Sequence, residues 1–116
     1  MTKPNLLGVL WVLAGCGGPL SQAAARDAAA RHMCDWYQKC GEVGSGKTYA
    51  TRDACDVKER SNWDSQFPLA KCDGKVIASD LDVCLKAIDS TVCGNGLDLL
   101  NTVFNKCNQA QVCKGT

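Results

Sequence analysis

The sequence predicts an all-α fold: a compact, disulfide-stapled bundle of about four helices. Four segments repeat apolar residues at helical spacing, and no segment shows the sustained alternation of a β-strand. Nine cysteines among 116 residues indicate an oxidising compartment, because so many thiols in a reducing one would require metal or catalytic chemistry. Apolar residues make up 46% of the chain, which is enough for a core and excludes a disordered or collagen-like protein.

The first element is an export signal. Lys3 lies in a short polar start, and residues 6–14 form an apolar run. As a helix this run would rise about 14 Å, half of the roughly 30 Å hydrocarbon core, so it is too short to span a membrane. A charged start, a short apolar run and small residues at its end are typical of a secretory signal. Residues 1–15 are therefore interpreted as a signal peptide and take no part in the fold.

Cys16 is the predicted lipidation site. The segment Leu13-Ala14-Gly15-Cys16 resembles a bacterial lipobox. The resemblance implies cleavage before Cys16 once a diacylglycerol is attached to its sulfur, followed by acylation of its amine with a fatty acid such as palmitate. The alternative is a plain signal with a coincidental cysteine. Three chains exceed the two signals that stable anchoring requires, so the expected partner is the lipid bilayer, reached through acylated Cys16.

The residues after Cys16 set the expected location. Gly17 and Gly18 stand where an aspartate would favour retention in the inner membrane. The resemblance to lipoproteins therefore implies the outer membrane, with the domain facing the periplasm or the exterior. Residues 16–21 are interpreted as a lipidated tether and residues 22–116 as the disulfide-rich helical domain.

The charge of the chain without its signal is close to zero. Removing Lys3 leaves twelve basic and twelve acidic residues, and no run of like charge exceeds two residues. This excludes the basic footprint of a nucleic-acid-binding protein, and no nucleic-acid partner is expected. Contact with a membrane is expected through the lipid rather than through a basic face.

Two helices are predicted in the first half of the domain. The alanine-rich stretch from about Ser21 favours a helix that Ser21 caps and Gly41 ends. Residues at helical spacing share one of its faces: Ala25, Ala29, His32, Met33, Trp36 and Cys40. The second helix is expected to start after Thr51 and to stop before Pro68.

Two more helices are predicted in the second half. Ser79 and Asp82 form a capping box at the start of the third, whose apolar face comprises Leu81, Cys84, Leu85 and Ile88. The fourth follows Asn95-Gly96 and carries one apolar stripe, made of Leu97, Leu100, Val103, Phe104 and Cys107. The core is expected to take most of the large aromatic residues: Trp36, Tyr37, Trp63, Phe67 and Phe104.

The cysteines after Cys16 form an even set and are predicted to pair as four disulfides: Cys34, Cys40, Cys55, Cys72, Cys84, Cys93, Cys107 and Cys113. They lack the close pairs of a zinc, redox or haem site, so no metal and no cofactor are expected. Eight cysteines allow 105 pairings. Because Cys34 and Cys40 lie on one helix, they are expected to take different partners. One pairing is favoured, Cys40 with Cys55 across the intervening loop.

The cysteine spacing and one loop resemble a known family. Its pattern is matched by Cys34, Cys40, Gly-Ser-Gly-Lys-Thr-Tyr at 44–49, Cys55, Cys72, Asp-Val-Cys-Leu-Lys-Ala-Ile at 82–88, and Cys93. The family consists of small bacterial lipoproteins of unknown function, described from gene neighbourhood as natural-product-biosynthesis lipoproteins. The resemblance covers roughly residues 28–113. It implies an association with secondary metabolism and provides no catalytic residues.

Residues 41–48, Gly-Glu-Val-Gly-Ser-Gly-Lys-Thr, match the pattern of a phosphate-binding loop in full. The surroundings disagree, because such a loop follows a strand of a parallel sheet, whereas a helix precedes this one. The favoured interpretation is a glycine-rich connection between the first two helices. The alternative is an anion-binding loop, in which backbone amides and a lysine act together: Gly44, Ser45, Gly46, Lys47 and Thr48.

No catalytic set is apparent. His32 is the only histidine, with Asp35 three residues further along the same helix. A partly buried, hydrogen-bonded histidine is favoured over a catalytic one. The expected function is therefore a membrane-anchored, non-catalytic binding or envelope-associated accessory module, which the resemblance links to natural-product biosynthesis. The alternatives are a small periplasmic enzyme that uses His32 with a carboxylate, and an inhibitor or immunity lipoprotein.

Overall fold

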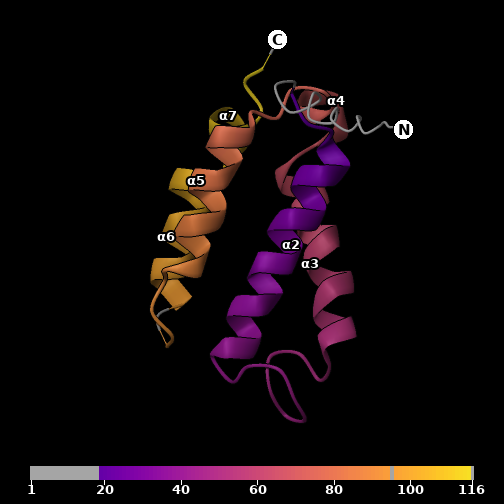
Figure 1. The fold of residues 1–116 in the computed structure, drawn as a ribbon. Coiled ribbons are helices and arrows are strands. Elements are labelled where there is room, and N and C mark those ends of the chain that lie inside the picture. The colour runs from indigo at the N-terminus through magenta and orange to yellow at the C-terminus, as the bar shows by residue number, and fades with distance from the viewer. Residues whose placement is uncertain (1–18, 95, 116) are drawn as a thin grey trace, which may run out of the picture.

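The computed structural model describes residues 19–94 and 96–115, and this part of the chain is helical as predicted (Figure 1). The helices are α2 (Gln22–Lys39), α3 (Arg52–Gln66), α4 (Leu69–Cys72), α5 (Ala78–Asp89), α6 (Gly96–Lys106) and α7 (Gln109–Val112). The described residues form no β-strand, only two isolated bridges, Leu20 with Val76 and Val43 with Tyr49. The four predicted helices correspond to α2, α3, α5 and α6. The predicted signal peptide and Cys16 lie outside the described residues.

The four long helices form two antiparallel hairpins. α2 and α3 lie side by side and are joined by the loop 40–51 at one end of the molecule, while α5 and α6 form the second hairpin (Figure 1). The connection through α4 crosses between the hairpins at the opposite end, where α7 also lies (Figure 1). α2 packs against both α3 and α5, and it is therefore the central helix.

The predicted bounds of α2 and α3 are confirmed. The Ser21 side chain accepts a hydrogen bond from the Ala24 N–H at 3.1 Å, and the Thr51 side chain accepts one from the Ala54 N–H at 3.0 Å. Each hydroxyl satisfies an amide that has no partner within its own helix. Gly41 has a φ of +75°, which a glycine adopts without strain, and it follows the end of α2.

The predicted start of α5 is wrong. α5 begins at Ala78 with Ile77 at the cap position, and no side chain caps it. Ser79 and Asp82 therefore lie inside the helix and form no capping box. A tertiary contact decides this, because the Ile77 N–H donates to the carbonyl of Val112 at 3.0 Å and holds the chain before the helix.

The core lies where α2 meets α3 and α5. Its buried apolar side chains come from these helices and from the residue after α3: Ala25, Ala29, Met33, Trp36, Trp63, Phe67, Leu81 and Ile88. The Trp36 indole N–H donates to the carbonyl of Thr91 at 2.8 Å, so the polar atom of this large core side chain is satisfied.

Four disulfides form, as predicted: Cys34–Cys55, Cys40–Cys93, Cys72–Cys113 and Cys84–Cys107. Cys34 and Cys40 take different partners, which confirms the argument from their places on one helix. The expected pairing of Cys40 with Cys55 is wrong. Cys55 lies on the buried face of α3 opposite Cys34, with their Cα atoms 5.9 Å apart. Cys40 follows the end of α2 and meets Cys93, in the loop after α5.

α6 departs most from the expected packing. Leu97, Leu100 and Phe104 of its predicted apolar stripe are 76%, 55% and 66% exposed. Leu99 is buried instead, and Cys107 is held against α5 by its disulfide. Successive helical residues are rotated by about 100°, so placing Leu99 and Cys107 against α5 turns much of the stripe outward. Of the five aromatic residues expected in the core, Phe104 is therefore excluded, whereas the two tryptophans and Phe67 are buried and Tyr37 is half-buried.

Candidate functional site

An apolar groove runs between α6 and the α2–α3 hairpin, because no described element covers this side of α6. The groove consists of two adjoining hollows that share four lining residues: Met33, Tyr37, Leu100 and Val103. The larger hollow has a volume of about 540 Å³, and the smaller one about 200 Å³. We call the two hollows together the α6 groove.

The two hollows differ in the rest of their lining. The larger one is completed by the apolar residues Trp36, Leu97 and Leu99, together with Gly96. The smaller one is completed by α3, which contributes Glu59, Asn62, Trp63 and Gln66. The groove is thus apolar along α6 and gains polar atoms where it reaches α3.

Tyr37 lines both hollows and is held by a row of aromatic rings. Its ring packs edge-on against Trp36, with 5.3 Å between centroids, and against Tyr49, with 5.2 Å between centroids. Trp36 belongs to the core and Tyr49 to the loop 40–51, so the row connects the core to the loop. Edge-to-face packing fixes the position of the Tyr37 ring in the groove.

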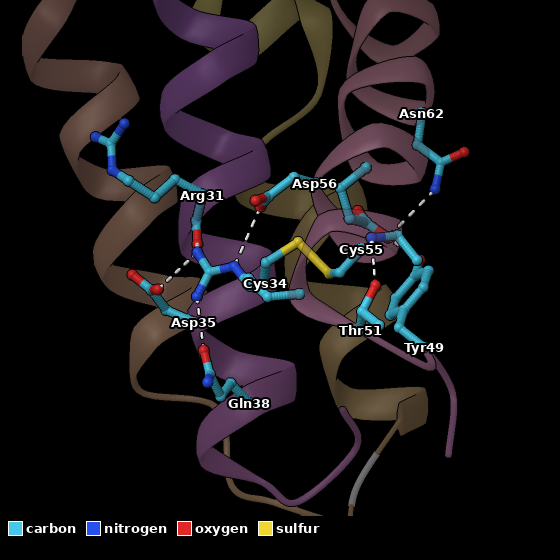
Figure 2. The surroundings of a disulfide bond; sticks show 12 residues. Arg31, Cys34, Asp35, Gln38, Tyr49, Thr51, Cys55, Asp56 and Asn62 are labelled. Atoms are coloured by element: carbon cyan, nitrogen blue, oxygen red, sulfur yellow. Dashed lines mark hydrogen bonds and ion pairs between the residues drawn. A yellow bond between two sulfur atoms is a disulfide. The ribbon is translucent and has the colours of Figure 1, made fainter. Parts of the chain in front are cut away.

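Glu59 supplies the charge at the polar end of the groove. It is only 3% exposed, although it lines the smaller hollow. Its Oε2 accepts a hydrogen bond from the Tyr49 hydroxyl at 2.5 Å and one from the Asn62 amide at 3.3 Å. Figure 2 shows Tyr49, from the loop, and Asn62, from α3, on the same side of the Cys34–Cys55 disulfide.

The carboxylate also affects the two tyrosines near it. The pKa of Tyr37 is raised by burial and by the negative charges of Glu59 and Glu42. The pKa of Tyr49 is raised further, by burial and by its hydrogen bond to Glu59. The Tyr49 hydroxyl therefore keeps its proton at neutral pH and donates it in the hydrogen bond to Glu59.

The glycine-rich loop lacks the geometry of a phosphate-binding loop. The Gly44 N–H donates to the Tyr49 carbonyl at 2.8 Å and the Lys47 N–H to the Gly44 carbonyl at 3.0 Å, so these amides are used within the loop. α3 begins only at Arg52, whereas in a phosphate-binding loop the helix follows the motif directly. The loop connects α2 and α3 as expected. Anion binding stays a prediction for its residues Gly44, Ser45, Gly46, Lys47 and Thr48.

His32 is hydrogen-bonded and partly buried, as favoured, but its partner is not Asp35. His32 Nδ1 lies 2.8 Å from Oδ1 of Asp89 in α5, and the His32 side chain is 26% exposed. Asp35 instead forms an ion pair with Arg52 in α3, at 2.9 Å. His32 and Asp35 make no contact within α2, because their side chains reach different neighbouring helices.

A second polar cluster lies beside the disulfide between α2 and α3. The Arg52 guanidinium is 2.9 Å from Asp35, 3.1 Å from Asp56 and 2.8 Å from the Gln38 amide oxygen. Figure 2 shows these three acceptors converging next to the disulfide. The arginine is engaged on several sides, so this cluster joins two helices rather than offering a free cationic site.

Residues 19–94 and 96–115 contain neither a cluster of metal-binding side chains nor a membrane-spanning helix. No group of three or more His, Cys, Asp or Glu side chains in these ranges is arranged to hold a metal ion. None of the helices there is both long and apolar enough to cross a bilayer. Cys16 lies outside these ranges, and its acylation stays a prediction.

Glu59 is a site residue that reasoning from the sequence misses. It lies four residues after Cys55 and four before Trp63, and all three are buried on the same stripe of α3. A carboxylate in the register of buried apolar residues is the signal that would have located it. The groove itself has no such signal, because it depends on how α6 is rotated.

Comparison with known proteins identifies a family but no activity. Residues 34–115 match the model of a family of unknown function, DUF6184, and the chain belongs to that family. No curated protein and no solved structure matches the chain. The predicted resemblance to a family of unknown function is thereby confirmed. The lipoprotein and natural-product associations are not part of the match and stay predictions.

Proposed function

We propose that this member of DUF6184 is an exported, lipid-anchored module of a bacterial envelope, which binds a ligand without catalysis as an accessory to natural-product biosynthesis. The observation that carries the binding role is the α6 groove. Its larger hollow, about 540 Å³, lies within the roughly 300–1,000 Å³ range of small-molecule sites. Four disulfides hold the helices around it, so the groove exists before a ligand arrives.

Export and anchoring are supported by separate features. Disulfides persist in oxidising compartments, so four of them favour an exported protein. The signal-like start of the chain and the lipobox-like segment that ends at Cys16 favour attachment of lipid at that residue. The glycines after Cys16 favour the outer membrane, with the domain facing the periplasm or the exterior. The natural-product association comes only from the resemblance to small bacterial lipoproteins.

Metabolic labelling with an alkyne-bearing palmitate tests the anchor. The wild-type protein is expected to take up the label and to sediment with outer membranes in a density gradient. Cys16→Ser is expected to lose both properties, whereas Gly17→Ala, next to it, keeps them. Recovery of unlabelled wild-type protein in the soluble fraction would contradict lipid anchoring.

Incubation with an extract of the producing cells tests binding without catalysis. The Cys16→Ser chain is mixed with the extract, re-isolated, and examined by native mass spectrometry. A bound small molecule is expected, with the same mass before and after prolonged incubation. A time-dependent change in that mass would indicate turnover and contradict the non-catalytic role.

The His32–Asp89 contact favours a second candidate, a small periplasmic enzyme. A carboxylate on Nδ1 is the arrangement that orients a histidine for proton transfer at Nε2. If His32→Ala abolishes a detectable conversion while the ligand still binds, the enzyme is favoured. If the variant leaves function intact, the contact is structural and joins α2 to α5.

A further inference from the structure

The charged end of the α6 groove lacks a cation. Glu59 is 3% exposed, and both of its hydrogen-bond donors, Tyr49 and Asn62, reach Oε2. No described residue donates to Oε1, and none of the ion pairs among the described residues includes Glu59. Burial of a carboxylate without a cation is unfavourable, and binding of a cation offsets the cost. The groove therefore favours a positively charged ligand.

The aromatic rings at this end add to the same preference. Tyr37 and Trp63 line the smaller hollow together with Glu59. The faces of such rings are electron-rich and attract ammonium groups, most strongly where water is displaced.

The rest of the groove offers only apolar contact. Met33, Leu100 and Val103 continue from the smaller hollow into the larger one. Leu97 and Leu100 are 76% and 55% exposed there, so a ligand that lies along α6 removes apolar surface from water. A ligand that matches both ends of the groove has an apolar body and one positive charge.

We propose that the α6 groove binds a small amphipathic amine, whose ammonium group pairs with Oε1 of Glu59 while its apolar body lies between α6 and Met33. This inference rests on the proposed binding function and deepens it by naming the class of ligand; it is independent of the lipid anchor. A carboxylate ligand of the same shape meets repulsion from Glu59. A neutral ligand gains the apolar contact alone.

The test compares three probes that share one carbon skeleton: octylamine, 1-octanol and octanoate. Each is titrated by calorimetry, below its aggregation concentration, into the full chain carrying Cys16→Ser, so that no attached lipid competes for the groove. Octylamine is expected to bind about tenfold more tightly than 1-octanol, the usual gain from a charge-assisted hydrogen bond. Octanoate is expected to bind most weakly.

Two pairs of variants assign the preference to the groove. Glu59→Gln keeps the shape and the bond from Tyr49, and it is expected to reduce the octylamine-to-octanol ratio to about one. Asp82→Asn, which removes an exposed carboxylate of α5 that lines neither hollow, keeps the ratio. Leu100→Ala weakens both amine and alcohol by about fivefold. Leu69→Ala, at 64% exposure but outside the groove, changes neither.

Several outcomes would overturn the inference while separating it from the proposed function. Equal binding of octylamine and 1-octanol, or an unchanged ratio in Glu59→Gln, would contradict the preference for an amine. The protein would then be a module that binds its ligand through apolar contact alone. If none of the three probes binds, both the proposed binding function and the proposed class of ligand are contradicted. A concentration-dependent dimer in sedimentation that Leu100→Asp dissociates would make the groove an interface between copies. If Glu59→Gln loses native disulfides, Leu100→Ala and its control, at exposed positions, still decide whether the probes occupy the groove.

Discussion

The α2–α3 and α5–α6 hairpins are each closed by one fully buried disulfide, yet they bury their apolar residues very differently. The disulfides join residues 21 and 23 positions apart. α2 is packed on two sides, by α3 and α5, whereas α6 contacts mainly α5 and the short α7. Phe67 at the end of α3 is fully buried, while Phe104 of α6 is 66% exposed. A disulfide can hold a helix in place without burying its apolar stripe, and here the unburied stripe forms one wall of a groove.

The largest difference between the hairpins is expected from matched phenylalanine substitutions. Phe67→Ala removes a fully buried ring and should lower the free energy of unfolding by about 3–5 kcal/mol. Phe104→Ala removes a mostly exposed ring and should change it by less than about 0.5 kcal/mol. Urea unfolding of both variants, with disulfides intact, measures the two values. Similar losses would mean that α6 is packed more tightly than its exposure indicates.

Removal of one buried disulfide from each hairpin sharpens the comparison. Because the closed loops are of similar length, each double cysteine-to-alanine variant should lose about 3 kcal/mol. The consequences for local order should differ. Without Cys84–Cys107, the amides of α6 are expected to exchange with solvent much faster, because little apolar packing remains to hold the helix. Without Cys34–Cys55, α2 and α3 should stay protected by their core.

Hydrogen exchange measured by mass spectrometry distinguishes these outcomes. Equal protection of α6 with and without its disulfide would show that packing, rather than the covalent bond, positions this wall of the groove. The Cys40–Cys93 pair, whose Cys93 is exposed, is a suitable control for the general effect of losing a bond.

Helix caps provide a smaller difference between the hairpins. Thr51→Ala removes the hydroxyl that accepts the Ala54 N–H, and should destabilise the protein by about 1 kcal/mol. Ser79→Ala should change stability by less than about 0.5 kcal/mol, because Ser79 lies inside α5 and caps nothing. Thermal unfolding at one pH compares the two. A cost for Ser79→Ala as large as that for Thr51→Ala would restore the capping box predicted from the sequence.

The smallest expected effect is a pH dependence that arises between α2 and α3. The pKa of Asp64 is lowered by the hydrogen bond from Gln22, at 2.9 Å, and by Arg26, at 3.3 Å. A carboxyl whose folded pKa lies below its unfolded value stabilises the protein above that unfolded value, near 4, and the contribution is lost as pH falls through the folded pKa. Asp64 is half-exposed, so the contribution is about 0.5 kcal/mol or less.

Asp64→Asn isolates this pH-dependent contribution to stability. The variant should lose slightly less stability than the wild type between pH 5 and pH 3, as measured by urea unfolding at each pH. Asp82→Asn, which removes an exposed pair with Lys86 on α5, is the matched substitution in the other hairpin. A larger acid sensitivity in Asp64→Asn than in the wild type would reverse the sign assigned here.

Part of the candidate site can be predicted from the sequence. Met33 and Trp36 follow the buried spacing of α2, and Leu97 and Leu100 follow the apolar stripe of α6. That these residues lie on opposite sides of a groove cannot be predicted, because the spacing identifies the apolar stripe of a helix but not the element that packs against it. Glu59 cannot be predicted as a site residue for a related reason. The register of α3 indicates that it faces inward, but only the fold places a hollow on that side.

The sequence by itself determined the helical class, the bounds of α2 and α3, and the number of disulfides, because these follow from local spacing, capping hydroxyls and an even count of cysteines. The tertiary structure alone decided which cysteines pair, where α5 begins and which way α6 turns. Each of these depends on a contact between residues far apart in the chain: Cys40 with Cys93, Ile77 with Val112, and Cys84 with Cys107. Such contacts depend on how whole helices pack against one another, so local sequence patterns do not predict them.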